Sequence, residues 1–171
     1  ALLEESLRLR PATAHFHANY GVQLIRLRRF DEAAAALARA VEMEPGQAGH
    51  HYNLGNAHLR SARAAQAVEC YRRALSLQPS HPLAALQLGL ALDDAGRRAE
   101  GIAHYRRELA MRPGDFGLVS NLGALLQEDC DIDGAIEVFR QALAQDPANF
   151  LAMNNIALML KERGEIHESV R

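Results

Sequence analysis

Histidine, cysteine and carboxylate side chains are the groups in this sequence that could bind a metal ion or catalyse a reaction. The chain of 171 residues has eight histidines and two cysteines, Cys70 and Cys130. None of the histidines falls in an H-E-x-x-H or Cys/His spacing of the kind that binds zinc. The acidic pair Asp93–Asp94 has neither a nucleophile nor a phosphate-binding glycine loop near it, so we interpret it as solvated turn carboxylates. We therefore expect no catalytic residue, no metal ligand and no cofactor.

Side-chain amides recur at a fixed spacing and offer a different chemistry. We call these five residues the amide row: Asn19, Asn53, Gln87, Asn121 and Asn155, each 34 residues from the next. Asparagine is a mediocre helix former because its side chain competes for backbone groups, so its return needs a reason. A carboxamide has donor and acceptor groups that match those of a peptide bond. The amide row is therefore a candidate site for binding a polypeptide backbone.

Other residue types keep the same period of 34 and indicate the elements that position the amide row. Proline recurs at Pro11, Pro45, Pro79, Pro113 and Pro147. Glycine recurs at Gly21, Gly55, Gly89 and Gly123. A small residue recurs at Ala33, Ala67, Gly101 and Ala135, and a large one follows it at Leu37, Tyr71, Tyr105 and Phe139. No insertion interrupts the period, which is typical of a repeat protein.

Each period predicts two short helices joined by a tight turn. In residues 48–81, apolar residues stand at helical spacing in both halves, and residues 61–63 form the turn between them. Pro79 closes the unit because proline cannot continue a helix. Gly96 and Gly164 lie at the equivalent inner turns, where a residue in the left-handed conformation commonly ends a helix.

These markers resemble the tetratricopeptide repeat, whose pattern of 34 residues has a Leu-Gly pair, then Ala-x3-Phe, then Pro. The sequence shows Leu54-Gly55, Leu88-Gly89 and Leu122-Gly123, then Ala67…Tyr71 and Ala135…Phe139. The place of the family's tryptophan holds His17, His51, Ala85, Val119 and Met153, and Glu108 replaces a small alanine. The resemblance implies an all-α fold, a right-handed α-solenoid of antiparallel helix hairpins.

The period divides the chain into a single array over residues 1–171. We expect the second helix of a truncated repeat at 1–13, complete repeats at 14–47, 48–81, 82–115 and 116–149, and a partial repeat at 150–171. One hairpin cannot bury its apolar face alone, so neighbouring hairpins must stack. Polar capping helices are not evident, and we expect the array to be part of a longer one.

The amide row is at position 6 of each repeat. Helical spacing places this position on one stripe of the first helix, together with positions 2, 9 and 13. By resemblance, this stripe lines the concave surface of a tetratricopeptide array. The ladder of asparagines resembles the superhelix of O-linked N-acetylglucosamine transferases, where it holds the backbone of bound protein substrates. The alternative is that the amides make hydrogen bonds between neighbouring repeats.

Other residues on the stripe or next to it give the expected surface its character. Arg26 and Arg60 would make it basic toward the N-terminus, while the later repeats carry acidic residues: Asp94, Glu128 and Glu162. Leucines of the third repeat would add an apolar patch, unless they pack on adjacent helices: Leu83, Leu86 and Leu90. Asn56 stands beside Asn53 as in arrays that clamp acidic C-terminal tails, but the chain has one lysine, Lys161. We therefore include Asn56 in the candidate site and do not expect an acidic tail as ligand.

Composition narrows the class of function. The net charge of −2 gives no reason to expect nucleic acid or a membrane surface as a partner, and two cysteines make no disulfide framework. We predict a non-enzymatic scaffold that binds an extended protein or peptide segment, in the cytoplasm of a bacterium, with the periplasm as the other compartment. Two alternatives remain: an assembly module that self-associates through uncapped ends, and the substrate-recruiting arm of a larger glycosyltransferase.

Overall fold

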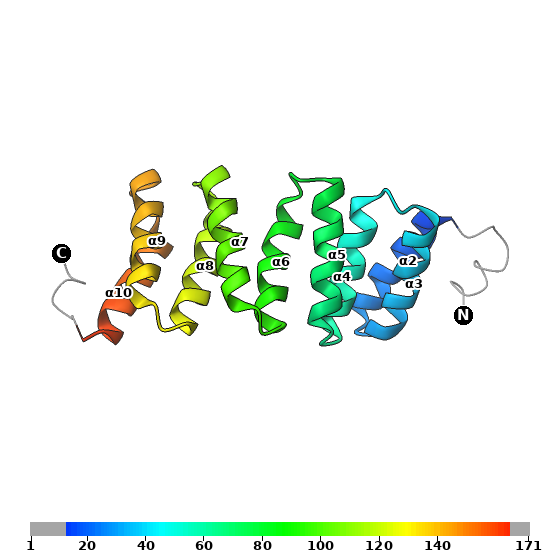
Figure 1. Ribbon diagram of the computed structural model, residues 1–171, viewed down its shortest axis with the longest axis horizontal. Coiled ribbons are helices and arrows are strands. Elements are labelled where there is room, and N and C mark those ends of the chain that lie inside the picture. Colours follow the sequence, from blue (N-terminus) through cyan, green and yellow to red (C-terminus); the bar gives the residue numbers. More distant parts are fainter. Residues whose placement is uncertain (1–12, 165–171) are drawn as a thin grey trace. The chain divides into compact units, whose positions relative to one another are not determined.

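Helix hairpins make up the part of the chain that the computed structural model describes, residues 13–164 (Figure 1). In that range the chain forms nine α-helices and no β-strand. The helices are α2 (Ala14–Arg26), α3 (Phe30–Met43), α4 (Ala48–Arg60), α5 (Ala64–Leu77), α6 (Pro82–Asp94), α7 (Arg98–Met111), α8 (Phe116–Glu128), α9 (Ile132–Gln145) and α10 (Phe150–Glu162). Every even-numbered helix begins 34 residues after the previous one, so the predicted all-α solenoid of hairpins is confirmed. The helix expected at residues 1–13 and the end of the partial repeat lie outside the described residues.

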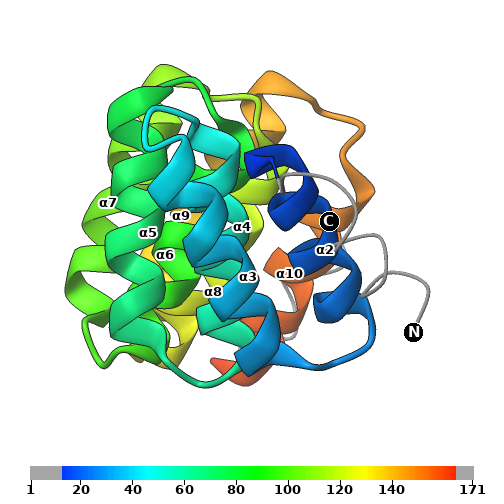
Figure 2. The same ribbon diagram turned by 90° about the vertical axis from the view of Figure 1, so that its right-hand side faces the viewer.

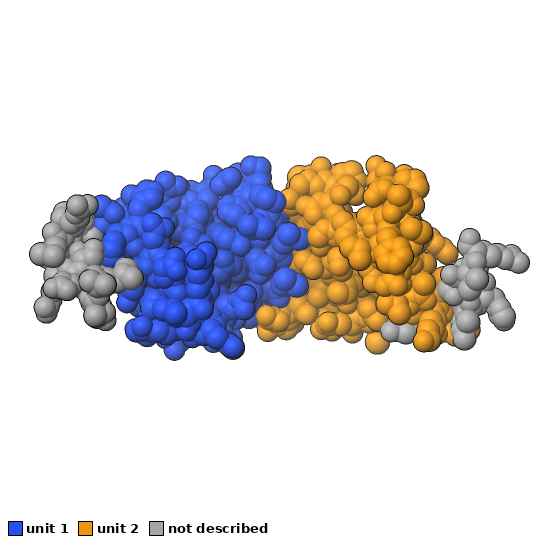
Figure 3. Space-filling view, turned by 180° about the vertical axis from the view of Figure 1, so that it is seen from behind, with its two compact units in different colours: residues 1–91 blue, residues 92–171 orange. Residues whose placement is uncertain are grey.

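The helices belong to two compact units, Ala1–Ala91 and Leu92–Arg171, which Figure 3 colours separately. In the first unit α2 packs against α3, α4 packs against α5, and α4 also contacts α2 and α3. Figure 2 looks at this unit from the N-terminal side and shows α2 and α3 side by side. In the second unit α8 packs against α7 and α9, and α9 packs against α10. Each core is therefore shared between successive repeats rather than enclosed by one hairpin.

A glycine of the first helix faces a large side chain of the second helix in three hairpins: Gly21 faces Leu37, Gly55 faces Tyr71 and Gly123 faces Phe139. A Cβ atom built on Gly55 would lie 2.7 Å from Cε1 of Tyr71, and one built on Gly123 would lie 2.5 Å from Cε2 of Phe139. Tyr71 is fully buried, and Phe139 is 2% exposed. The aromatic rings therefore occupy the space that a side chain at the glycine position would need, and the two backbones approach closely.

The inner turn of every described hairpin contains one residue in the left-handed conformation. The expectation is confirmed at Gly96, with φ of 72°, and at Gly164, with φ of 82°. The equivalent residues of the other hairpins have the same conformation without being glycine: Arg28 at 60°, Ala62 at 57° and Cys130 at 62°. The geometry of the turn requires this conformation whatever residue stands there, so residue type alone did not predict it at these three positions.

Side chains cap four of the described first helices, namely α2, α6, α8 and α10. Thr13, Asp115 and Asn149 each precede a first helix, and the side-chain oxygen of each accepts a hydrogen bond from a backbone N–H in the first turn of that helix. This bond satisfies a donor that the helix itself leaves without a partner. His81 does the same through Nδ1, which accepts the N–H of Ala84 at 3.2 Å. His51, at the tryptophan place, is buried, and its Nε2–H donates to the carbonyl oxygen of Pro45 at 2.9 Å.

Glu108, which stands where other repeats have a small alanine, is accommodated by an ion pair. Its side chain is 13% exposed and lies 2.5 Å from Nη2 of Arg112, one turn later on the chain. Arg112 also lies 3.5 Å from a carboxylate oxygen of Asp115. The acidic substitution is thus neutralised locally, and the hairpin keeps its fold.

Replacing Gly55 by alanine tests the close approach of the two helices. The added methyl group would overlap the ring of Tyr71, so we expect Gly55→Ala to lower the free energy of unfolding by about 1–3 kcal/mol. Gly49→Ala is the matched control, because that glycine lies on the same helix with no atom near its Cβ position. The control should raise stability by about 0.5 kcal/mol through helix propensity. Urea unfolding followed by circular dichroism measures both, and equal effects would contradict the packing argument.

Replacing Ala62 by glycine tests the strain at the inner turn. An alanine at φ of 57° carries a steric cost that glycine lacks, so Ala62→Gly should stabilise the protein by roughly 0.5–1 kcal/mol after the entropy cost of glycine. The same substitution at Ala35, which is exposed within α3, should destabilise it by about 1 kcal/mol. We expect the melting temperature to rise in Ala62→Gly and to fall in Ala35→Gly. A fall in both variants would refute the strain at Ala62.

Candidate functional site

The amide row places one residue on the first helix of each repeat. Asn19 is exposed, and its four counterparts are half-buried: Asn53, Gln87, Asn121 and Asn155. The neighbouring residues Leu54 and Gly55 are buried against the second helix of their hairpin. Packing thus separates the two stripes of each first helix and leaves the amides available to solvent.

Two amides of the first unit are free to meet a ligand. Asn19 lies on α2 and Asn53 on α4, and these two helices contact each other. Within residues 13–164, neither carboxamide makes a hydrogen bond to another residue. Each therefore keeps its donor and acceptor capacity for a molecule outside the chain.

Two other candidate residues already have partners inside their units. Oδ1 of Asn56 accepts the hydroxyl proton of buried Tyr71 at 2.8 Å, and Nδ2 of Asn121 donates to Oη of Tyr105 at 3.4 Å. Burial of the Tyr71 ring raises the pKa of its hydroxyl far above the ordinary value, so this group stays protonated and acts as a donor. Asn121 and Tyr105 belong to successive repeats, which is the bridging role that we considered as the alternative for the row.

The charged residues of the stripe differ between the two units. Arg26 and Arg60 are exposed in the first unit, and neither has an ion pair with a described residue. In the second unit Glu128 is paired with Arg98 at 2.7 Å, which neutralises part of the expected acidity. Asp94 is exposed.

The leucines of the third repeat lie together on α6. Leu83 is 52% exposed, while Leu86 and Leu90 are half-buried. One of the three therefore presents most of an apolar side chain to solvent, and the others contribute a smaller area.

The second unit has a groove that sequence spacing did not predict. Its volume is about 620 Å³, and it lies between α7 and α9 over the first half of α8. Leu109, Val119 and Val138 give it an apolar floor, and Arg106 and Glu137 stand among its lining residues. These residues come from three helices, and no spacing along the chain marks them as a group.

His58 is a polar residue at a place that other repeats fill with leucine. Its equivalents are Leu24, Leu92, Leu126 and Leu160, each of which is buried. Nδ1 of His58 is buried and has no hydrogen-bond partner in the described part of the chain. Burial lowers the pKa of His58, and the positive charge of Arg63 lowers it further. The folded protein therefore disfavours protonation of this imidazole.

Comparison with known proteins now defines the class. The model of the tetratricopeptide repeat family matches residues 1–49 and 52–116, which is more than half of the chain. The chain belongs to this family. Tetratricopeptide repeats are protein–protein interaction modules, and the chain is a scaffold of this kind. The comparison with curated proteins found no match.

Solved structures with the same fold include YrrB and MamA. A structure described as "YrrB: a TPR protein with an unusual peptide-binding site" has 17% identity and a TM-score of 0.70, over 99% of this chain and 88% of that one. A MamA structure has 20% identity and a TM-score of 0.75, over 94% and 88%. MamA from Desulfovibrio magneticus RS-1 has 20% identity and a TM-score of 0.74, over 92% and 89%. At identities of 17–20%, this similarity shows a shared fold and nothing more.

A helix must be both long and apolar to cross a membrane. Among residues 13–164, no helix combines the necessary length with sufficient apolar character.

Replacing His58 by leucine tests the unsatisfied imidazole. Its pKa is lowered in the folded protein, whereas in the unfolded chain it is about 6.5. The unfolded state therefore binds more protons as the pH falls through about 6.5, and stability is lost there. We expect His58→Leu to be more stable than wild type at pH 7.5, by about 1–3 kcal/mol.

The same variant should also lose less stability between pH 7.5 and 5.5. Urea midpoints at both values measure the difference between the variant and wild type, which isolates His58 from the other histidines. Parallel losses in the two proteins would show that His58 titrates equally in the folded and unfolded states.

Proposed function

We propose that the first unit binds an extended polypeptide through Asn19 and Asn53, which contact its backbone. The observation that carries this proposal is the state of the two carboxamides. Both are accessible, both lie on first helices that touch each other, and neither bonds to another described residue. Gln87 of the same unit extends the row by one repeat.

The spacing of the helices suits an extended ligand. Packed helices lie roughly 8–10 Å apart, and an extended chain advances about 3.3–3.6 Å per residue. One amide per repeat would thus meet about every third residue of the ligand. Because a carboxamide matches a peptide bond, this contact does not depend on the side chains of the ligand.

Residues beside the amides supply contacts for ligand side chains. Arg26 and Arg60 offer exposed guanidinium groups for carboxylates or carbonyl oxygens. Leu83 offers an apolar surface. In the second unit, Asn155 is the equivalent half-buried amide without an intramolecular hydrogen bond in the described range.

The comparison with YrrB supports a peptide as the partner, since that tetratricopeptide protein is described as having a peptide-binding site. We propose that the chain itself acts without catalysis, either alone or as the recruiting arm of a larger enzyme. Free Cys70 and Cys130 support the cytoplasm as its location.

Removing the two free amides tests the proposal. Peptides are first selected from a random display library on the wild-type chain, and their affinities are measured by fluorescence anisotropy. The double variant Asn19→Ala/Asn53→Ala should weaken binding by about 5- to 150-fold, because two hydrogen bonds of about 0.5–1.5 kcal/mol each are lost. Gln66→Ala is the matched control, since it removes an exposed amide from α5, outside the row, and should leave affinity unchanged.

The contrary outcomes are equally definite. Unchanged affinity in the double variant, with folding verified by circular dichroism, would refute backbone binding by the row. Failure to select any peptide, together with a mass by light scattering that rises with concentration, would favour the assembly module instead.

A further inference from the structure

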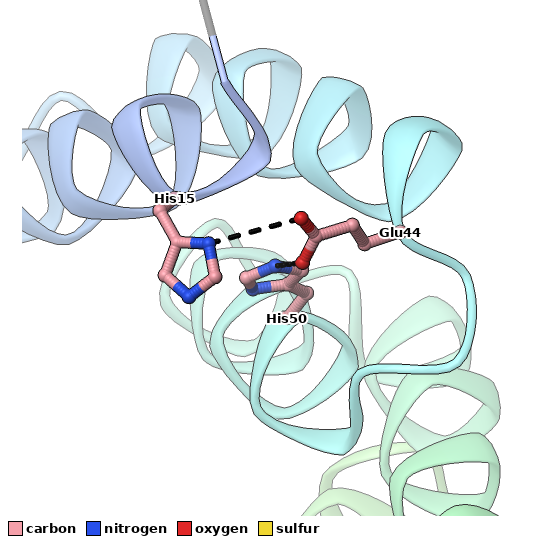
Figure 4. Close-up of side chains that lie close together, drawn as sticks. All are labelled: His15, Glu44 and His50. Carbon is pink, nitrogen blue, oxygen red and sulfur yellow. Dashed lines mark hydrogen bonds and ion pairs between the residues drawn. The ribbon is translucent and has the colours of Figure 1, made fainter.

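Three side chains of metal-ligating type converge in the first unit from three different elements (Figure 4). His15 is in the first turn of α2, Glu44 follows the end of α3, and His50 is in the first turn of α4. Nε2 of His50 lies 3.3 Å from Oε2 of Glu44, and Nδ1 of His15 lies 3.8 Å from Oε1 of the same carboxylate. One ligand atom from each residue falls within 4.8 Å of the other two.

The three side chains differ in how far they are exposed to solvent. The side chain of His50 is 9% exposed and that of Glu44 is 39% exposed, whereas that of His15 is 71% exposed. The two imidazole rings meet edge to face, with centroids 5.8 Å apart. A metal ion would therefore have a preformed half-site on Glu44 and His50 and an open approach on the side of His15.

His50 occupies a place that the repeat otherwise fills with an apolar residue. The equivalent residues of later repeats are Ala84, Leu118 and Ala152, and each is fully buried. An imidazole at such a place must satisfy its ring nitrogens, and packing alone does not require it. The presence of a buried histidine here needs a chemical reason.

We call the place where the second helix of one repeat leads into the first helix of the next repeat a junction. Among the junctions in the described part of the chain, this one alone has all three ligands. The residues equivalent to His15, Glu44 and His50 at the next three junctions are Gly49, Gln78 and Ala84; then Leu83, Arg112 and Leu118; then Gly117, Asp146 and Ala152. Asp146 is the single ligating side chain among those nine. The fold of the repeat therefore does not demand these three residues, and they distinguish this junction from the others.

We propose that His15, Glu44 and His50 form a Zn²⁺ site. Two imidazole nitrogens and one carboxylate oxygen, with water as the fourth ligand, are a common tetrahedral set for zinc. Two nitrogen ligands disfavour Mg²⁺ and Ca²⁺, which take oxygen ligands. Ligand atoms about 2.0–2.2 Å from the ion lie roughly 3.3 Å from one another in a tetrahedron, so the longer separations close by rotation of the exposed His15 side chain.

The bound ion would tie the start of α2 to the connection between α3 and α4. Stability of the first unit then depends on zinc, because ligand binding to the folded state alone stabilises it. This inference concerns different side chains from the free amides and does not rest on peptide binding.

Isothermal titration of ZnCl₂ into the full chain tests the site. Wild type should bind one ion per chain through the cluster, and His15→Ala and Glu44→Gln should each weaken this binding at least tenfold. His17→Ala removes another histidine of α2 that lies outside the cluster, so it should leave binding unchanged. Equal affinity in all four proteins, or no binding by wild type, would overturn the proposal.

Two further measurements distinguish a specific metal site from non-specific surface binding. They use variants of His15 and Glu44 and leave the buried His50 unchanged, because its replacement would disturb folding. Co²⁺ in the tetrahedral site should give an intense visible absorption in wild type that is lost in His15→Ala. Zinc in hundredfold excess over its Kd should raise the melting temperature of wild type by roughly 5 °C, and MgCl₂ should not. A weak Co²⁺ spectrum typical of octahedral coordination would show that the three residues form no tetrahedral site, and the same melting shift in Glu44→Gln would show that Glu44 is no ligand. Either result would overturn the proposal.

Discussion

The close contact between a glycine of one helix and a large side chain of its partner is the constraint on which the other features of the hairpins depend. Where Gly55 meets Tyr71, the ring fills the volume that a Cβ would need. The two helices then approach closely enough to bury one stripe of α4, and the opposite stripe is left to solvent. The accessibility of Asn53 is thus a consequence of the contact at Gly55, two residues along the same helix.

The same packing explains why departures from the repeat pattern change local chemistry without changing the fold. Glu108 replaces a small residue and pairs with Arg112. His51 replaces an aromatic residue and holds the preceding connection through the carbonyl of Pro45. His58 has no such compensation at Nδ1, so its site carries a cost that depends on pH. Each departure is tolerated because one hairpin contributes a limited share of a core that neighbours complete.

Most of the fold was predictable because its signals are local. The period of 34, the prolines and the small residues predicted two helices in each repeat, since each reports the backbone or its nearest neighbour. The left-handed residues at Arg28, Ala62 and Cys130 were not predicted, because the turn imposes that conformation on side chains that do not favour it. The division of the chain into one array of repeats stays a prediction.

The candidate site stays a prediction, and the structure adds the surroundings of its residues. Sequence by itself determined that the amide row shares one face of successive helices, because helical spacing fixes the direction of each side chain. Only the tertiary structure decided that Asn121 and Asn56 have tyrosine partners while Asn19 and Asn53 have none. It alone brought His15, Glu44 and His50 together, because they lie on different elements and their separation depends on how those elements pack. A hydrogen bond or a ligand set between helices has no fixed spacing along the chain, which is why the sequence did not reveal it.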